Sequence, residues 1–311
     1  MTISVLRTAE GWWVRKGSDA ARIETPAATT GELLRDRAAI QAAQRSATTV
    51  PVETLALLSP VTRPCRVVAQ MTNFVSHVRD AGMDPDSTPL TFFRKSSASI
   101  SGPYEPIVKP SHVRLLDYEV EIGLVVGRDI PAGTTVSDDL SDSIAGLVVT
   151  NDVSARDIQL PQTQFYEAKS YPTFTPVGPA LVLLDGEELN RFGDLRLRLS
   201  VNGQERQNSV VAGDMLYRPL PALRSLCRFQ DLSAGDLILT GTPVGTALSA
   251  PPKPVEMISR LLPPAVKWKA FFKGQARNPK YLKDGDRVEA AVATDDGAID
   301  LGTQKTAVRY S

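Results

Sequence analysis

The segment "LLDYEVEIGLVVG" (Leu115–Gly127) decides the fold, because its apolar and acidic residues alternate. In a β-strand, successive side chains point to opposite faces of the sheet. From the tyrosine onward every second residue is apolar, which predicts a strand with one face packed on a core. The other face begins acidic and ends apolar at Val125. Buried, unpaired carboxylates at Glu119 and Glu121 would cost several kcal/mol each, so another group must compensate them.

A third carboxylate ends the next apolar run, "IAGLVVTND", at Asp152. A buried strand of this kind delivers its last side chain to the edge of the sheet. Glu119, Glu121 and Asp152 together offer a face of oxygen donors for one hard divalent cation per chain, Mg²⁺ or Mn²⁺. Without a cation the three carboxylates would repel one another and their pKa values would rise. The alternative is that the E-x-E pair forms an ordinary solvated face.

Three further polar residues follow Asp152. If "NDVSARDIQ" turns into a helix at once, Arg156 and Gln159 fall at i+4 and i+7, on the face of Asp152. Lys169 follows in "YEAKSYPTFTPVGP". A guanidinium, an amide and an ammonium beside a metal suit a small dicarbonyl substrate that carries a carboxylate. The alternative for each is an arginine paired with a nearby acid and a solvated lysine.

The sequence contains two histidines, and one has an acidic partner at helical spacing. His77 lies in "MTNFVSHVRDAG", with Asp80 three residues later, so on a helix the carboxylate would orient the imidazole as a general base. His112 has no such partner. The alternative is a surface pair. The motif "LTGTPVG" (239–245) ends an apolar strand in small residues that a ligand can approach closely.

Composition excludes several classes of function. The 35 basic and 35 acidic residues cancel and no basic run stands out, so we expect no nucleic-acid or membrane partner. Cys65 and Cys227 lie far apart, which fits thiols in a reducing compartment. No apolar signal region and no run of about 18 apolar residues occurs, so the sequence predicts a cytoplasmic protein.

The chain divides into two parts. Residues 1–62 predict a small N-terminal α+β domain, in which Thr30 is a plausible N-cap of a helix. Residues 63–311 alternate apolar strands with turns, and "SVNGQE" (200–205) carries an Asn-Gly hairpin signal. The pair Pro263-Pro264 interrupts any long helix. The fold class predicted is therefore α+β and strand-rich.

Several motifs, taken in order, resemble those of the fumarylacetoacetate hydrolase family. They are "TNFVSHVRD", "TFFRKSSASISGPYEPIVKP", "DYEVEIGLVVG", "NDVSARDIQ", "KSYPTFTPVGP" and "LTGTPVG". The resemblance covers residues 63–311, as the catalytic domain. It implies a mixed β-sandwich roll of that family's C-terminal-domain type, usually a homodimer, that acts on a small 2-oxo or diketo carboxylic acid. Fumarylacetoacetase itself has a fourth carboxylate near the lid, where this chain has Asn73. In this the chain resembles the subgroup with three metal-binding carboxylates, which contains acylpyruvases and oxaloacetate decarboxylases.

The resemblance also implies roles for single residues. The implied ligands of Mg²⁺ or Mn²⁺ are Glu119, Glu121 and Asp152. The implied substrate-binding and enolate-stabilising residues are Arg156, Gln159, Lys169 and Thr242. The implied base and its orienting partner, on a lid segment, are His77 and Asp80.

The leading hypothesis is hydrolysis of a C–C bond in a β-diketo acid such as an acylpyruvate, through a metal-stabilised enolate. The alternatives are decarboxylation, tautomerisation or hydration of a 2-oxo acid such as oxaloacetate on the same site, or a metal-binding scaffold without turnover. The chain departs from the family at Asp80, where glutamate is usual, and at Met71 and Phe74. Its segment 248–282 is longer than in most members, and we expect it to cover the site or build the dimer interface; the alternative is that it packs on the outside.

Overall fold

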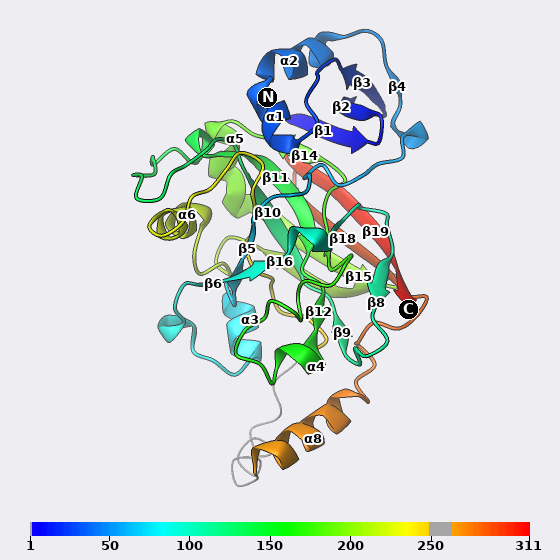
Figure 1. Ribbon diagram of the computed structural model, residues 1–311, viewed down its shortest axis with the longest axis vertical. Helices are drawn as coiled ribbons and strands as arrows, with labels where there is room; N and C mark the ends of the chain where they lie inside the picture. Colours follow the sequence, from blue (N-terminus) through cyan, green and yellow to red (C-terminus); the bar gives the residue numbers. More distant parts are fainter. Residues whose placement is uncertain (1, 249–262) are drawn as a thin grey trace.

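A ten-stranded mixed sheet runs through the molecule in the computed structural model, which describes residues 2–248 and 263–311 (Figure 1). Strand β10 (Val120–Val126), which lies within the acidic and apolar segment Leu115–Gly127, is near the middle of this sheet, between β11 and β17. In spatial order the strands are β4 (Val50–Pro51), β3 (Asp19–Ile23), β2 (Gly11–Lys16), β1 (Ile3–Thr8), β14 (Leu181–Leu183), β11 (Ile144–Asn151), β10 (Val120–Val126), β17 (Leu237–Leu239), β5 (Val67–Met71) and β6 (Thr91–Lys95).

A second, five-stranded sheet shares a core with the first. Its strands are β16 (Gln204–Val210), β15 (Leu195–Val201), β18 (Arg287–Thr294), β19 (Asp300–Tyr310) and β8 (Ile107–Lys109). Ile122 of β10, Leu197 of β15 and Val292 of β18 belong to one buried cluster. Two short pairs complete the strands: β9 (Leu116–Asp117) with β12 (Ser154–Ala155), and β7 (Ile100–Ser101) with β13 (Thr175–Pro176). The strand-rich α+β class is confirmed.

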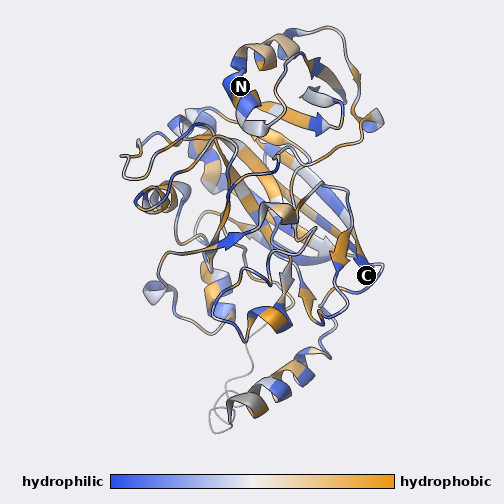
Figure 2. Ribbon diagram, viewed as in Figure 1, coloured by the Kyte–Doolittle hydropathy of each residue, from blue (hydrophilic) through white to orange (hydrophobic). Residues whose placement is uncertain are grey.

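Both faces of β10 are buried. The alternation predicted burial of the even-numbered face, and the solvated face that was the alternative for the E-x-E pair is not what the structure shows. The even-numbered side chains face the core between the sheets, while Val125 belongs to a second cluster with Val148 and Leu237. Between the glutamates and Val125, Gly123 leaves no space for a side chain, because a Cβ there would lie 2.6 Å from a methyl carbon of Val148. The central strands are accordingly the most apolar part of the sheet in Figure 2.

The N-terminal strands extend the large sheet. Strand β1 pairs with β14 in antiparallel fashion, so one sheet crosses the predicted boundary at residue 62, and the two-domain division stays a prediction. Helices α1 (Thr30–Arg35) and α2 (Arg37–Arg45) add Leu33 and Ile40 to the second cluster. The N-cap prediction is wrong by one residue: Thr29 caps α1, because the hydroxyl of Thr30 is held by Pro60.

The Asn-Gly hairpin prediction is confirmed, because Asn202 and Gly203 join β15 to β16 with φ angles of 53° and 77°. The other α-helices of the described residues have 4 to 12 residues each: α3 (Val75–Asp80), α4 (Arg156–Gln159), α5 (Gly186–Asn190), α6 (Pro219–Cys227) and α8 (Pro264–Gln275). Single 3₁₀ turns are η1 (Val52–Thr54), η2 (Pro85–Ser87), η3 (Ser97–Ser99), η4 (Leu140–Asp142) and η5 (Arg191–Asp194).

Helix α8 begins at Pro264, consistent with the break expected at the proline pair. It extends away from the two sheets in Figure 1 and touches the core through Phe272. Residues 249–262 of the long segment lie outside the described part of the chain, so its role stays a prediction. Within residues 2–248 and 263–311, every helix is too short or too polar to cross a membrane.

Candidate active site

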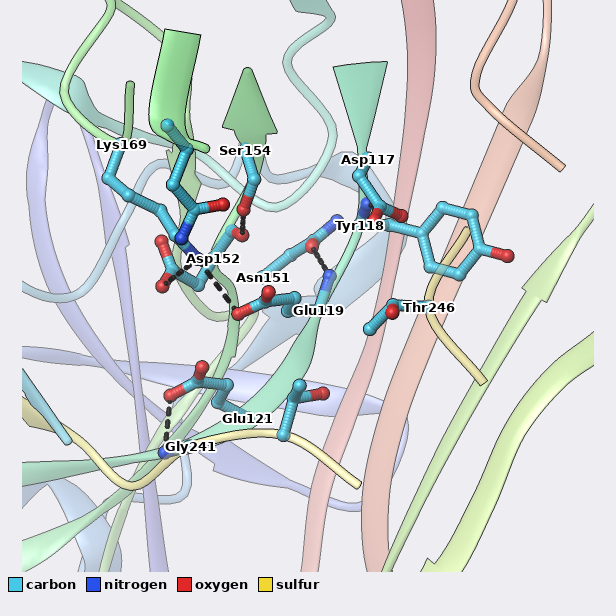
Figure 3. Close-up of polar contacts among 12 residues, drawn as sticks. Asp117, Tyr118, Glu119, Glu121, Asn151, Asp152, Ser154, Lys169, Gly241 and Thr246 are labelled. Carbon is cyan, nitrogen blue, oxygen red and sulfur yellow. Dashed lines mark hydrogen bonds and ion pairs between the residues drawn. The ribbon is translucent and has the colours of Figure 1, made fainter. Parts of the chain in front are cut away.

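Three carboxylates meet where β10 and β11 run side by side. Glu119 immediately precedes β10, Glu121 lies on it, and Asp152 immediately follows β11. The strands are antiparallel, and the Asp152 N–H donates to the Glu119 carbonyl oxygen at 2.8 Å. One oxygen of each carboxylate lies within 4.8 Å of the others, and all three residues are buried (Figure 3). The structure thus brings together the three residues predicted to bind a cation.

Buried cations join two of these carboxylates to Asp117. The Lys169 ammonium lies 2.8 Å from Glu119 Oε2 and 2.7 Å from Asp152 Oδ2. The Arg156 guanidinium bonds Glu119 and, at 2.8 Å, Asp117 Oδ2. With Lys95 on the other oxygen of Asp152, six charges of alternating sign form one chain: Asp117, Arg156, Glu119, Lys169, Asp152 and Lys95.

The pairing sets the protonation of Glu119. Burial alone would raise the pKa of its carboxyl group. Lys169 and Arg156 outweigh that effect and hold the pKa well below its usual range. Glu119 is therefore ionised at neutral pH.

Glu121 stands outside this chain of charges. Its carboxylate accepts a hydrogen bond from the Gly241 N–H at 2.7 Å, with no lysine or arginine within ion-pair distance in the described residues. Burial, with the nearby charges of Asp152 and Glu119, raises the pKa of Glu121 well above its usual value. A divalent cation would relieve this excess of negative charge.

The donor set fits Mg²⁺ or Mn²⁺. All three candidate ligands are carboxylate oxygens, the hard donors that these ions prefer. The three residues lie on or directly beside two adjacent strands. With all four carboxylates ionised, as a bound cation requires, the carboxylates and the three cations of the cluster carry one net negative charge, which a divalent ion would convert to one positive charge. A site of that sign favours a substrate with carboxylate groups.

The chain beyond Asp152 differs from the sequence-based expectation. Residues 154–155 form strand β12, paired with β9, and the helix begins only at Arg156, so the helix predicted from Asp152 is wrong. Bonds to other segments take the backbone groups that the helix would have used: the Ala155 N–H donates to the Ala168 carbonyl oxygen and the Arg156 N–H to that of Leu115, both at 2.9 Å. Arg156 and Gln159 still meet, as neighbours within α4, where the guanidinium donates to the Gln159 amide oxygen at 2.7 Å.

A cavity of about 190 Å³ opens onto this acidic cluster. Of the nine residues predicted for the site, all except Asp80 and Asp152 line it. Met71, Phe93, Phe165 and Leu248 add apolar surface. The cavity residues are Gln70, Met71, Thr72, His77, Ala81, Met83, Phe93, Glu119, Glu121, Arg156, Gln159, Leu160, Phe165, Lys169, Gly241, Thr242 and Leu248.

Thr242 lies at the cavity, but its hydroxyl already has partners. The hydroxyl donates to the Val120 carbonyl oxygen and accepts from the Gln207 amide, both at 2.8 Å. Gln207 is buried and also donates to the Pro243 carbonyl. These bonds fix the Thr-Gly-Thr-Pro turn against β10. A contact between Thr242 and a substrate carboxylate therefore stays a prediction.

His77 projects from α3 to the cavity without a hydrogen bond to Asp80. Its Nδ1 is buried and has no hydrogen-bond partner in the described part of the chain. Burial lowers the pKa of the imidazole, and the charges of Glu119, Arg156 and Lys169 each act on that pKa more strongly than Asp80 does. The imidazole is consequently neutral at physiological pH, with an unused ring nitrogen. The assignment of His77 as base and Asp80 as its partner stays a prediction.

Sequence reasoning assigned no role to two charged residues of the cluster. Asp117 accepts from Arg156 and from the N–H groups of Ala247 and Leu248, at 2.7 and 3.0 Å. It therefore ties the arginine to the start of the long segment. Lys95 ends the run "TFFRK" and contacts Asp152. Both residues lie in motifs that carry the family resemblance, Asp117 in "DYEVEIGLVVG" and Lys95 in "TFFRKSSASISGPYEPIVKP". Without the resemblance, the signal is a charge at the end of a strand with partly apolar neighbours, which is common on solvated surfaces too.

The chain matches one protein-family model and is similar in sequence to several known proteins. Residues 66–309 match the family model described as fumarylacetoacetate (FAA) hydrolase C-terminal. The mitochondrial oxaloacetate tautomerase Fahd2a of Rattus norvegicus is 32% identical over 245 residues, covering 78% of this chain and 68% of the rat protein. Protein Rv2993c of Mycobacterium tuberculosis is 35% identical over 201 residues, covering 63% of this chain and 71% of that protein.

A solved structure extends the similarity to the whole chain. A probable 2-hydroxyhepta-2,4-diene-1,7-dioate isomerase from Mycobacterium abscessus superposes with a TM-score of 0.75 at 28% identity. The superposition covers 100% of this chain and 99% of that structure, so it includes the N-terminal strands and helices.

Proposed function

The chain belongs to the fumarylacetoacetate hydrolase family, and we propose that it is a divalent-metal-dependent tautomerase of short 2-oxo dicarboxylic acids of the oxaloacetate type. The size of the cavity carries this proposal. About 190 Å³ is small beside the roughly 300–1,000 Å³ of common ligand pockets, so a compact acid fits better than an acylpyruvate with a long acyl chain. The rat relative is named as a tautomerase and the similar mycobacterial protein as a probable isomerase, which supports the same choice.

The carboxylates of the site would hold the cation. Glu119, Glu121 and Asp152 are its candidate ligands. A bound Mg²⁺ or Mn²⁺ supplies a Lewis acid that polarises the 2-oxo group and the adjacent carboxylate. The positive charge that remains on the loaded site attracts the second carboxylate of the substrate.

The side chains around the cation would bind the substrate and move a proton. Lys169 faces the cavity and stabilises the negative charge on the enolate oxygen. Gln159 accepts from Arg156 through its amide oxygen, which leaves its amide N–H groups to donate to a substrate carboxylate. A ring nitrogen of the neutral His77, which lines the cavity, takes the proton from carbon 3 of the keto form, and the enolate oxygen takes up a proton from water to give the enol; the reverse direction returns both.

Hydrolysis of a C–C bond, the leading hypothesis from the sequence, is the second candidate. One observation favours it: a neutral His77 with a free ring nitrogen can equally take a proton from an attacking water. Tautomerisation needs no such water. The two reactions therefore use the same metal and the same base. They differ in whether the cavity admits an attacking water beside the substrate.

Parallel assays separate the two candidates. The metal-free protein is reloaded with Mg²⁺ or Mn²⁺ and given enol oxaloacetate or an acylpyruvate, with EDTA as the control. We expect metal-dependent acceleration of the enol–keto interconversion of oxaloacetate and slower cleavage of the acylpyruvate. Faster cleavage of the acylpyruvate, without acceleration of tautomerisation, would establish the hydrolase instead. No turnover of either substrate in the loaded protein would favour the scaffold without catalysis.

We also propose that the chain forms a homodimer, as the family resemblance implies. Light scattering coupled to size-exclusion chromatography should give twice the mass of one chain. A monomer mass at micromolar concentration would contradict this. The cytoplasmic location predicted from the sequence stays a prediction, and the rat relative is named as mitochondrial.

A further inference from the structure

We propose that Lys95 is a positioning residue that holds the Asp152 carboxylate in the orientation needed to bind the cation, an inference that rests on the proposed metal site. Lys95 ends β6, and its side chain is 0% exposed. It contacts Asp152 and, like Asp152, does not line the cavity, so it has no direct contact with a substrate held there. Apart from the field of its charge, the effect of Lys95 on the site is transmitted through its hydrogen bond to Asp152.

The hydrogen bonds of Lys95 close a ring around Asp152. The ammonium donates to Asp152 Oδ1 and, at 2.9 Å, to the Phe174 carbonyl oxygen. The same carbonyl accepts from the Val153 N–H at 3.1 Å. One lysine thus links the side chain of Asp152 to the backbone of the next residue through a fixed point on a neighbouring segment.

The backbone of Asp152 is also held on both sides, so its side-chain torsions are its main freedom. Its N–H donates to Glu119, and its carbonyl accepts from the Ser154 hydroxyl at 2.9 Å (Figure 3). Lys95 fixes those torsions by engaging Oδ1. The other oxygen, Oδ2, is then directed toward Lys169, on the side of the carboxylate cluster.

The two lysines on Asp152 therefore differ in what they can do. Lys169 lines the cavity and bridges two candidate ligands, so it can contact the substrate. Lys95 contacts one ligand and the backbone only. Burying an ammonium costs several kcal/mol unless it is paired, so an apolar residue would be the cheaper filler at this position. Groups behind metal ligands commonly orient them, and their loss weakens metal binding about 10–100-fold.

Charge and orientation make opposite predictions for Lys95, which allows a decisive test. Replacing the lysine by a neutral residue removes a positive charge beside the cation site, so a purely electrostatic role predicts tighter binding. A positioning role predicts weaker binding, because Asp152 loses its fixed orientation. The sign of the change in metal affinity therefore separates the two.

The experiment compares Lys95→Met and Lys95→Gln, which have the same charge and differ in hydrogen-bonding capacity. The affinity of the metal-free, full-length protein for Mn²⁺ is measured by electron paramagnetic resonance of the free ion. We expect a loss of about 10–100-fold in Lys95→Met and a smaller loss in Lys95→Gln, whose amide can still donate to Asp152. Unchanged or tighter binding in Lys95→Met, or equal losses in both variants, would overturn the proposal.

Lys109→Met is the matched control for loss of a buried lysine. Lys109 is 7% exposed and donates to the Val113 carbonyl at 2.6 Å, on β8, without contact to the carboxylate cluster. We expect wild-type Mn²⁺ affinity in this variant. A loss equal to that of Lys95→Met would mean that general destabilisation explains both, and would overturn the proposal.

A double variant keeps the test valid if Lys95→Met fails to fold. Lys95→Met in an Asp152→Asn background removes both partners of the ion pair, which is tolerated better than removing one. If Lys95 acts through Asp152, Mn²⁺ affinity in the double variant equals that of Asp152→Asn within about threefold. A larger difference would contradict the proposal. Absence of Mn²⁺ binding in the wild-type protein would instead refute the metal site itself.

Discussion

The two sides of the cavity are built differently. The floor, defined as Glu119, Glu121 and Asp152 with the cations that pair with them, is held by hydrogen bonds at nearly every charged atom. The wall, defined as helix α3 with His77 and Asp80, leaves the Nδ1 of His77 without a partner. The floor is thus organised before substrate binds, whereas the wall has hydrogen-bonding capacity that substrate can complete.

This difference has an energetic side. Most buried charges of the floor contact an opposite charge that offsets the cost of desolvation, so removal of one member leaves its partner uncompensated. Glu121 is the exception, because no lysine or arginine of the described residues pairs with it. Asp80 is only half-buried and outside that network. Substitution of a paired charge in the floor should consequently reduce stability and activity together, while substitution of His77 in the wall should reduce activity alone.

The largest effect is expected for Asp152→Asn, in the floor. The change leaves two buried lysines, Lys95 and Lys169, without a carboxylate that both contact. We expect the free energy of unfolding of the metal-free protein to fall by about 3–5 kcal/mol, with loss of metal-dependent turnover. Urea unfolding monitored by circular dichroism measures the first.

Glu121→Gln is the matched variant within the floor. Glu121 has no buried cation as partner, and its raised pKa favours the neutral form, which glutamine imitates. We expect unfolding to change by less than about 1 kcal/mol, although turnover is lost with the ligand. Equal destabilisation by both variants would show that ion pairing is not what distinguishes Asp152.

The second largest effect is expected for His77→Gln, in the wall. If His77 moves the proton, turnover should fall about 10²–10⁴-fold, in line with general-base catalysis. The midpoint of thermal unfolding should change little, because His77 has no hydrogen-bonding partner at Nδ1 to lose. Steady-state kinetics with saturating Mg²⁺ tests this, and a variant with full activity would remove His77 from the mechanism.

The same contrast explains what the sequence could reveal. Alternation along Leu115–Gly127 placed Glu119 and Glu121 on one face, and the end of β11 placed Asp152 beside them, because strand geometry relates side chains over short distances. Lys95 lies in one of the motifs that resemble the family, but it received no role because its partner is 57 positions away in sequence, and no local pattern encodes such pairing.

Other features of the site depended on similar non-local information. The helix that was expected to begin at Asp152 begins at Arg156, because residues 154–155 pair with β9, about 40 positions earlier in the chain. The spacing of His77 and Asp80 suits a helix, and the helix exists, yet the side chains do not bond. Spacing predicts which residues share a face, but the choice of hydrogen-bond partner depends on what surrounds that face.

A smaller effect is expected from pH, and it concerns the floor. The pKa of Glu121 is raised in the metal-free protein, and a cation must displace that proton to bind. Affinity for Mn²⁺ should therefore increase as pH rises toward the pKa of Glu121, by up to about tenfold per pH unit, and level off above it. Calorimetry in buffers of different ionisation enthalpy should show proton release on binding, and pH-independent affinity without release would contradict the raised pKa.

The smallest effect is expected for Asp80→Ala, and it tests whether the wall stays as described when substrate binds. Asp80 does not line the cavity and acts on the pKa of His77 less strongly than Glu119, Arg156 and Lys169 do, so its removal should change turnover by less than about threefold. Asp80→Asn keeps the shape and removes the charge, which makes it the control for packing. A loss of tenfold or more in both variants would mean that α3 rearranges on binding and joins Asp80 to His77, as the sequence predicts. In that case the contrast between floor and wall would hold only before substrate binds, because the wall would then be organised by the substrate itself.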